Sequence, residues 1–307
     1  MSKQTRKLRD LLAAKTFLHI PAVYDPLSTR LVEQIGFEVA YVGGYVTGAS
    51  RAITEPLLTM TEQPNVAGEC AQSVDIPVLA DAGAGFGEPL HTMRTIKEFI
   101  RAGLAGCHIE DQLFPKRAFY HKYVAHMISR DEYLAKLRLA CRERDAIDKN
   151  FLVIARTDAL RGEGFDETIT RLNLAADTGV NMGLLFPRSR EEAERAPRLA
   201  RLPLLYVQSR GNRDGRPLFT TAEMKQIGYV ACVDAQVVLL TAFHYMKKAL
   251  AELRQIGDTT VISCADFMVA RKAVEDLIRL DEYYAIEEET VEGQNLKLPN
   301  SQTEAVP

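Results

Sequence analysis

The chain has 307 residues, of which 47% are hydrophobic and 26% are charged. These proportions are typical of a soluble globular protein, and they exclude a disordered chain, a collagen and a small disulfide-rich protein. The 38 basic and 41 acidic residues leave a formal net charge of −3 without a long basic run, so nucleic acid is not an expected partner.

Cysteine usage and apolar runs bear on the compartment. The five cysteines are scattered and form no CxxC pair, so they favour a reducing compartment over a disulfide framework or a zinc site. The N-terminal sequence MSKQTRKLRDLLAAKTF has a positive start but lacks the apolar core of a secretory signal. No stretch reaches the ~18 apolar residues of a membrane-spanning helix. We therefore expect a cytoplasmic protein without a membrane partner.

One local pattern recurs along the chain: a short apolar segment followed by a longer segment with helical periodicity. The apolar segments are residues 17–23, 38–44, 77–82, 106–111, 151–159, 181–186, 203–208 and 229–235. The first precedes a helical pattern at 26–36, and the second precedes a loop and then a helix at about 61–74. Several segments are apolar almost throughout, as parallel strands buried on both faces are. Eight such units, with no GxGxxG after the first, favour a closed (β/α)₈ TIM barrel over an open doubly wound sheet.

The segment after about residue 256 departs from this pattern. Residues 264–289 predict one or two further helices, and residues 291–307 are a polar tail. We therefore expect a barrel with an N-terminal helix over residues 1–255, a C-terminal helical extension over 256–290, and the tail. Extra helices at the C-terminus of a barrel often cover a neighbouring subunit, so the extension favours an oligomer.

The ends of the predicted strands carry the polar residues of interest, because catalytic groups of such barrels come from the C-terminal ends of the strands. Four strands are followed by Gly43 to Tyr45, Asp81 to Gly87, His108 to Gln112, and Arg156 to Asp158. Asp81 and Glu110 would face each other and repel, which predicts a Mg²⁺ site. Arg156 would offer a planar fork for a substrate carboxylate or phosphate. The alternative is that the two acids cap helices and satisfy loop amides.

A long connection follows the fourth predicted strand, before a helix that starts near Ser129. Connections beyond ~12 residues are commonly lids. Lys116, Tyr120 and His121 in this connection are candidates for closing over an anion and moving a proton. The alternative for each of them is a place in a solvated basic surface loop.

Four segments carry a family resemblance: PAVYDPLSTRLVEQIGFEVAYVGGYVTGAS, LADAGAGFG, HIEDQLFPKR and IARTDA. In this order and spacing, they resemble the isocitrate lyase/phosphoenolpyruvate mutase superfamily from about residue 8 to 255. The resemblance implies a (β/α)₈ barrel whose eighth helix is swapped with a neighbour, and a homotetramer or homodimer. It also implies Mg²⁺, or Mn²⁺ in its place, and small anionic 2-oxo or 2-hydroxy dicarboxylate substrates or their phosphonate analogues. Reactions of that superfamily pass through a metal-bound enolate.

The resemblance also implies roles for individual residues. The positions that match metal-site acids are Asp81 and Glu110. The positions that match substrate-binding residues are Arg156, Gly43, Gly44 and Tyr45, the last three through backbone amides. Lys116 matches the lysine that begins the KRCGH motif of the lyases, and we expect it to act in catalysis with Arg156, Tyr120 and His121.

The metal site departs from the superfamily pattern at two positions. Gly83 stands where the pattern has the second aspartate of a DxD motif, which should weaken the ion or leave its place to water or Glu88. Another acid is expected where this chain has Thr54, although the adjacent Glu55 could substitute for it.

The proton-transfer residues also depart from the pattern. Ala118 stands where the lyases keep the cysteine of KRCGH, the proton donor of their reaction, and no acid occurs between the sixth strand and Pro187. The serine of the carboxylate loop is Gly43. Loss of a positioned proton donor typically lowers a rate ~10²–10⁴-fold, which disfavours isocitrate and methylisocitrate cleavage. Tyr120 or His121 could take the role if the lid closes.

Three functions are compatible with these residues. The leading hypothesis is a lyase or decarboxylase that cleaves a C–C bond in an oxaloacetate-like acid or a substituted malate through a metal-stabilised enolate. The second is a mutase or hydrolase that acts on the P–C bond of a phosphonate. The third is a catalytically degenerate barrel that binds a metabolite, which the changes at Gly83, Thr54 and Ala118 motivate.

Overall fold

Eight parallel strands form the central sheet in the order β1-β8-β7-β6-β5-β4-β3-β2. The computed structural model describes residues 2–14, 17–117 and 122–292. The strands are β1 (Leu18–Pro21), β2 (Ala40–Val42), β3 (Val78–Asp81), β4 (Gly106–Glu110), β5 (Leu152–Arg156), β6 (Met182–Leu184), β7 (Leu204–Gln208) and β8 (Ala231–Asp234). A bridge between Ala22 and Tyr41 brings β1 beside β2, so the sheet nearly closes. The predicted (β/α)₈ barrel is confirmed.

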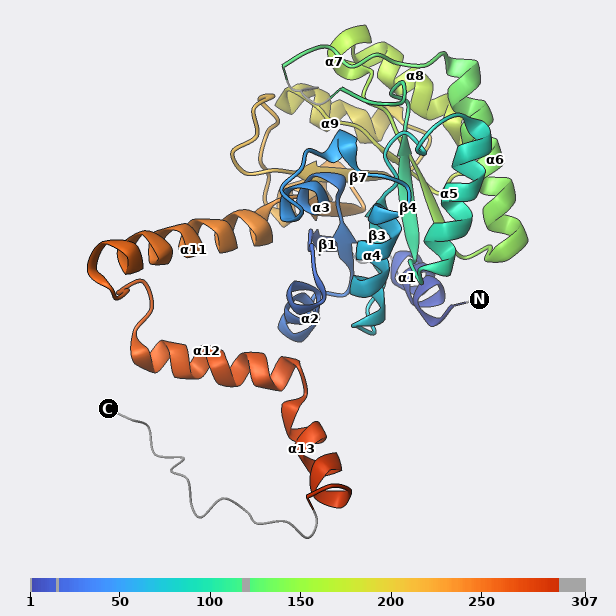
Figure 1. The fold of residues 1–307 in the computed structure, drawn as a ribbon. Coiled ribbons are helices and arrows are strands. Elements are labelled where there is room, and N and C mark those ends of the chain that lie inside the picture. Colours follow the sequence, from blue (N-terminus) through green and yellow to red (C-terminus); the bar gives the residue numbers. More distant parts are fainter. Residues whose placement is uncertain (1, 15–16, 118–121, 293–307) are drawn as a thin grey trace. The chain divides into compact units, whose positions relative to one another are not determined.

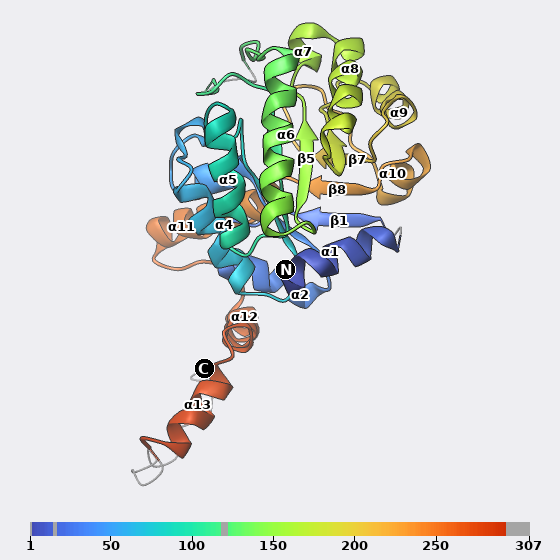
Figure 2. The same cartoon turned by 90° about the vertical axis from the view of Figure 1, so that its right-hand side faces the viewer.

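Most of the helices before residue 230 lie on the outer side of this sheet (Figures 1 and 2). Those that precede residue 150 are α1 (Lys3–Ala13), α2 (Pro26–Ile35), α3 (Gly44–Ser50), the 3₁₀ helix η1 (Glu55–Leu57), α4 (Glu62–Gln72), α5 (Pro89–Arg101) and α6 (Arg130–Ile147). Those that follow are α7 (Leu160–Glu163), α8 (Phe165–Ala175), the 3₁₀ helix η2 (Ala176–Thr178), α9 (Arg190–Leu199) and α10 (Thr221–Ile227). The chain then continues in α11 (Val237–Ile256), α12 (Cys264–Leu277) and α13 (Leu280–Glu289).

The helix limits follow from local signals in most cases. Helix α2 begins at a capping box in which Asp25 accepts from the Ser28 amide, and it ends at Gly36, whose φ of 102° is left-handed. Residues 44–50 are different, because the sequence predicted a loop there and the structure has α3. Its glycines are poor helix formers, but Gly48 allows close packing, since a Cβ there would lie 2.9 Å from the Glu55 amide nitrogen. Tertiary packing therefore makes this helix.

Strand residues alternate between two apolar clusters. The inner cluster contains Leu79, Leu152 and Ile154 together with Leu8 of α1. The cluster under the helices contains the residues between them, such as Val153. Since successive side chains of a strand point to opposite faces, this alternation decides which residues at the strand ends point into the barrel mouth.

Contacts divide the chain into two units, Met1–His244 and Tyr245–Pro307. The first contains the barrel. In the second, helices α12 and α13 have no buried residue, and their large apolar side chains, such as Phe267 and Met268, are exposed. Among the described residues, no helix has the length and hydropathy that a bilayer crossing requires.

Candidate active site

Strand alternation brings two acids and an arginine together at the barrel mouth. Asp81 and Arg156 follow inner-cluster residues by two positions, and Glu110 follows Ile109 of the outer cluster by one. All three side chains therefore point inward at the C-terminal edge of neighbouring strands. The Arg156 Nη1 atom lies 3.0 Å from Glu110 Oε2 and 3.7 Å from Asp81 Oδ2. These are the residues that the sequence predicted to face one another.

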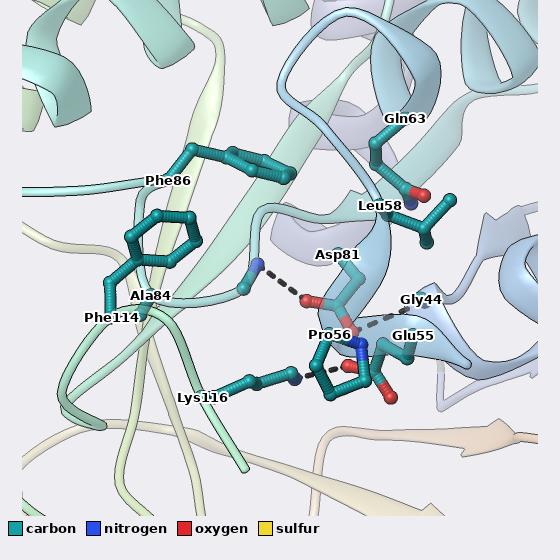
Figure 3. A pocket seen from close by; sticks show the side chains of 11 residues that line it. Gly44, Glu55, Pro56, Leu58, Gln63, Asp81, Ala84, Phe86, Phe114 and Lys116 are labelled. Carbon is teal, nitrogen blue, oxygen red and sulfur yellow. Dashed lines mark hydrogen bonds and ion pairs between the residues drawn. The ribbon is translucent and has the colours of Figure 1, made fainter. Parts of the chain in front are cut away.

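Lys116 reaches this cluster from the connection after β4. Its Nζ atom forms ion pairs with Glu55 and with Glu110, the latter at 3.1 Å from Oε1. Figure 3 shows the Lys116 side chain pointing at Glu55 across the pocket. The acid contributed by the segment after β2 is therefore Glu55, whereas Thr54 contributes only to the wall of the adjoining cavity.

Asp81 has a second function besides its place in the charged cluster. It accepts hydrogen bonds from the Gly83 amide at 2.7 Å and from the Gly44 amide at 3.2 Å, both drawn in Figure 3. The proposed alternative, that this acid satisfies loop amides, is thus part of its role. Burial would raise the pKa of Asp81, but His108 when it is protonated, together with Lys116 and Arg156, holds it below its usual range.

Glu110 and Arg156 are buried ion-pair partners. Burial raises the pKa of Glu110 to about 7, against the opposing effect of Arg156 and Lys116. Burial would lower the pKa of Arg156, but Asp158, Glu110 and Asp81 raise it well above its usual value. Asp158 binds the Nε and Nη2 atoms of Arg156 at 3.0 and 2.9 Å from its Oδ1 and Oδ2 atoms. The guanidinium is therefore held in one orientation, with Nη1 toward the other acids.

A tyrosine and a histidine that were not predicted as site residues complete the cluster. The Tyr41 hydroxyl lies 2.6 Å from His108 Nε2. Burial lowers the pKa of His108 to about 4, with Asp81 opposing the effect, so the imidazole is neutral near pH 7. Its Nε2 then accepts from Tyr41, and the Nδ1 proton faces Asp81 Oδ1 at 3.6 Å. The alternation of side chains along β4 could have predicted this position. His108 precedes Glu110 by two residues, so both side chains point to the same face of the strand.

The loop after β3 owes its path to glycine. Gly83 and Gly85 have φ of 51° and 76°, values that glycine adopts without steric penalty. A Cβ at Gly85 would lie 2.3 Å from Thr92 Oγ1. The buried Lys136 Nζ donates to the Ala84 carbonyl at 2.9 Å, so helix α6 also holds the loop that carries the backbone partner of Asp81.

The donor set fits a loosely held Mg²⁺. Asp81 and Glu110 supply hard carboxylate oxygens, and the Glu110 oxygens also face Lys116 and Arg156 at 3.1 and 3.0 Å. Among the described residues, no three His, Cys, Asp or Glu side chains form a metal-binding group. Glu88 does not replace the missing acid at Gly83, because its side chain is exposed where α5 begins. Mg²⁺ commonly uses one or two carboxylates and keeps several waters.

The other predicted site residues have different outcomes. Gly43 is the N-cap of α3, so Gly43, Gly44 and Tyr45 belong to the start of a helix rather than to a loop. All three line a cavity of about 450 Å³ that adjoins the charged cluster. Tyr120 and His121 lie outside the described residues, as does Ala118.

Comparisons with known proteins place the chain in a family. The sequence pattern of the family described as phosphoenolpyruvate phosphomutase matches residues 8–272. The chain belongs to the isocitrate lyase/phosphoenolpyruvate mutase superfamily. Within this superfamily, a probable 2-methylisocitrate lyase of Corynebacterium glutamicum is 33% identical over 94% of this chain and 92% of its own length. The 2,3-dimethylmalate lyase of Eubacterium barkeri is 30% identical over 94% and 98%.

The superfamily assignment is also supported by solved structures. An oxaloacetate acetylhydrolase in complex with the inhibitor 3,3-difluorooxalacetate has a TM-score of 0.84 and 30% identity, and the match covers 94% of this chain and 98% of that one. The similarity therefore extends over nearly the whole length of both chains.

Proposed function

We propose that this superfamily member is a lyase or decarboxylase that cleaves a C–C bond in a small 2-oxo or 2-hydroxy dicarboxylic acid, either oxaloacetate-like or a substituted malate. The observation that carries the proposal is the cluster in which Lys116 and Arg156 lie against Glu55, Glu110 and Asp81 at the barrel mouth. Related chains with lyase names support it.

The cluster suits a reaction that develops negative charge. In cleavage of a 2-hydroxy acid, the hydroxyl proton is removed, the C2–C3 bond breaks, C2 becomes a carbonyl carbon, and the electron pair passes to C3 as an enolate that is then protonated. In decarboxylation of a 2-oxo diacid, CO₂ leaves and the pair passes to an enolate in the same way. Lys116 and Arg156 are fixed positive groups that stabilise the enolate charge without reorganising.

Substrate carboxylates have two places to bind. Arg156 lines the cavity, and its guanidinium, oriented by Asp158 and Glu110, would be the positive group of the first place. The backbone amides of residues 43–45 are the second place, and that of Gly44 also donates to Asp81. Lys116, Tyr120 and His121 would close the lid, and Tyr120 or His121 would carry the proton that the missing cysteine carries in the lyases.

Asp81 and Glu110 would hold Mg²⁺, or Mn²⁺, with affinity weakened by Gly83. The ion, when bound, supplies Lewis-acid stabilisation of the enolate oxygen. Without a third acid beside it, the ion would keep more of its water ligands.

The assay that tests this proposal is direct. Purified protein is incubated with C4–C7 2-oxo and 2-hydroxy acids, with and without Mg²⁺, and pyruvate, glyoxylate and CO₂ are measured. We expect product from at least one acid, and more of it with the metal. Release of none of the three products from any acid would contradict the proposal.

A second candidate is chemistry at a P–C bond, which the match to the phosphoenolpyruvate phosphomutase pattern favours. Phosphorus NMR of phosphonopyruvate mixed with the protein tests it. A new resonance would support a mutase or hydrolase, and an unchanged spectrum would exclude both.

We also propose a homodimer or homotetramer formed through the C-terminal helices. Leu250, Leu253 and Ile256 of α11 are at least half exposed, an arrangement that is unfavourable for a monomer. Native mass spectrometry should give a multiple of 34.3 kDa, and L250E with L253E should shift it to the monomer. A wild-type monomer at micromolar concentration would contradict this.

A cytoplasmic location is part of the same proposal. Cys70, Cys107, Cys141 and Cys232 are buried free thiols, a state typical of reducing compartments.

A further inference from the structure

The 450 Å³ cavity extends from the charged cluster to the loop that follows β7. Sites of 300–1,000 Å³ hold drug-sized ligands, so this volume exceeds what a four-carbon diacid needs. The additional space lies against residues that neither the sequence motifs nor the proposed chemistry use: Ser209, Asn212, Arg213, Asp214, Arg216 and Gln236.

Arg216 is built into the wall of this space. Its side chain is 8% exposed and binds Asp214 Oδ2 at 2.8 Å and the Val207 carbonyl at 3.1 Å through its two Nη atoms. Its guanidinium also stacks on the Phe186 ring at 4.3 Å. The buried Nε atom has no hydrogen-bond partner among the described residues. That atom has almost no accessible surface, so the remainder of the Arg216 side chain is what lines the cavity.

Arg213 adds a positive charge to the same wall. Within the described part of the chain, no acid forms an ion pair with it, and its side chain is exposed at the cavity. The loop itself is held in shape by Asn212, which donates to the carbonyls of Ser209 and Arg216 and accepts from the Arg216 amide. Ser209 donates to Gln236 Oε1 at 2.8 Å. The cationic wall is therefore preorganised.

An apolar surface separates this wall from the charged cluster. Leu184, Phe186 and Val207 line the same cavity, and Phe186 is the residue that both arginines contact, Arg156 at 4.7 Å and Arg216 at 4.3 Å from its ring centroid. A ligand that reaches both ends must therefore carry hydrocarbon between its polar groups.

We infer that Arg213 and Arg216 are specificity-determining residues that bind an additional carboxylate, carried on a hydrocarbon arm of the substrate beyond the group that reacts. The inference rests on the proposed function for the identity of the reacting end, at Arg156 and Lys116. The distal carboxylate takes no part in bond breaking and leaves unchanged on one of the two products.

The test compares ligands that differ only at the distal end. Calorimetry at fixed Mg²⁺ measures the Kd of 2-oxoglutarate, of its distal amide 2-oxoglutaramate, and of pyruvate, which has no distal group. We expect 2-oxoglutarate to bind at least ~10-fold more tightly than the amide, as a charge-assisted hydrogen bond provides. In R213Q and R216M the ratio of the Kd of 2-oxoglutaramate to the Kd of 2-oxoglutarate should fall toward one. The Kd of pyruvate should stay within about twofold of the wild-type value.

Two further measurements keep the outcomes distinct. R201Q, which removes an exposed arginine paired with Asp177, should keep the wild-type preference, and R216K should retain part of it. Equal affinities for 2-oxoglutarate and 2-oxoglutaramate in the wild type would overturn the inference. Tighter binding of 2-oxo-4-phosphonobutanoate than of 2-oxoglutarate would overturn the assignment to a carboxylate. If the distal preference holds but no acid is cleaved, the proposed function fails and the distal site stands.

Discussion

The two sides of the barrel mouth use charge in different ways. On the side of β3 to β5, Lys116 and Arg156 are already paired with buried carboxylates of the same chain. On the side of β6 to β8, Arg216 is paired with Asp214, whereas Arg213 is exposed and has no ion pair within the described part of the chain. The first arrangement holds a fixed electrostatic field, which is what a reacting centre requires. The second leaves one positive group, Arg213, exposed at the cavity, where an anionic part of a ligand can reach it.

The largest expected effect comes from removing a positive charge on the β3–β5 side of the barrel mouth. K116M removes a positive charge from the reacting centre and leaves Glu55 and Glu110 without that partner. We expect kcat/KM on the best substrate to fall ~10²–10³-fold, with some loss of stability because buried acids become undercompensated. Steady-state kinetics and thermal unfolding measure both effects. The control is K97M, which removes the lysine of a partly exposed ion pair with Glu143, and an activity of K116M equal to that of the control would refute the assignment.

The next effect concerns the loop after β3, which carries the Gly83 amide that binds Asp81. G85A puts a methyl group against Thr92 Oγ1 at a φ of 76°, so we expect a loss of about 2 kcal/mol or more in the free energy of unfolding. The matched control is G103A, whose φ is 88° but whose Cβ would have nothing within 4 Å, and about 1 kcal/mol is expected there. Urea unfolding of both variants measures the difference, and equal losses would show that the loop tolerates the contact.

The smallest of the three effects comes from adding an acid at Gly83, beside Asp81. At Gly83 a Cβ would meet nothing within 4 Å, and the φ of 51° lies in the left-handed region, where aspartate and asparagine are the better-tolerated side chains. G83D should therefore tighten Mg²⁺ binding by about tenfold. G83N is the matched control, with the same backbone demand and no charge. Calorimetry that gives the same Kd for both variants would show that no ion binds beside Asp81.

The sequence predicted the residues on the β3–β5 side of the mouth better than those on the β6–β8 side, for a physical reason. Asp81, Glu110 and Arg156 end apolar strands, so the register of a parallel sheet alone brings them together. Arg213 and Arg216 are positioned by hydrogen bonds of Asn212 within a long loop, and no periodic pattern reports such bonds. Similarly, all eight strands were predicted, whereas α3 was missed because it is formed by packing rather than by helix propensity.

The C-terminal helices connect the stability of the protein to its concentration. Their apolar side chains, such as those of Leu250 and Phe267, are exposed, so the free energy that orders them must come from association if the proposed oligomer forms. Mass action then applies: dilution below the dissociation constant would expose these helices while the barrel keeps its own core. Proteolysis in residues 245–292 would become faster on dilution, so a single unfolding temperature would describe the barrel but not the whole chain.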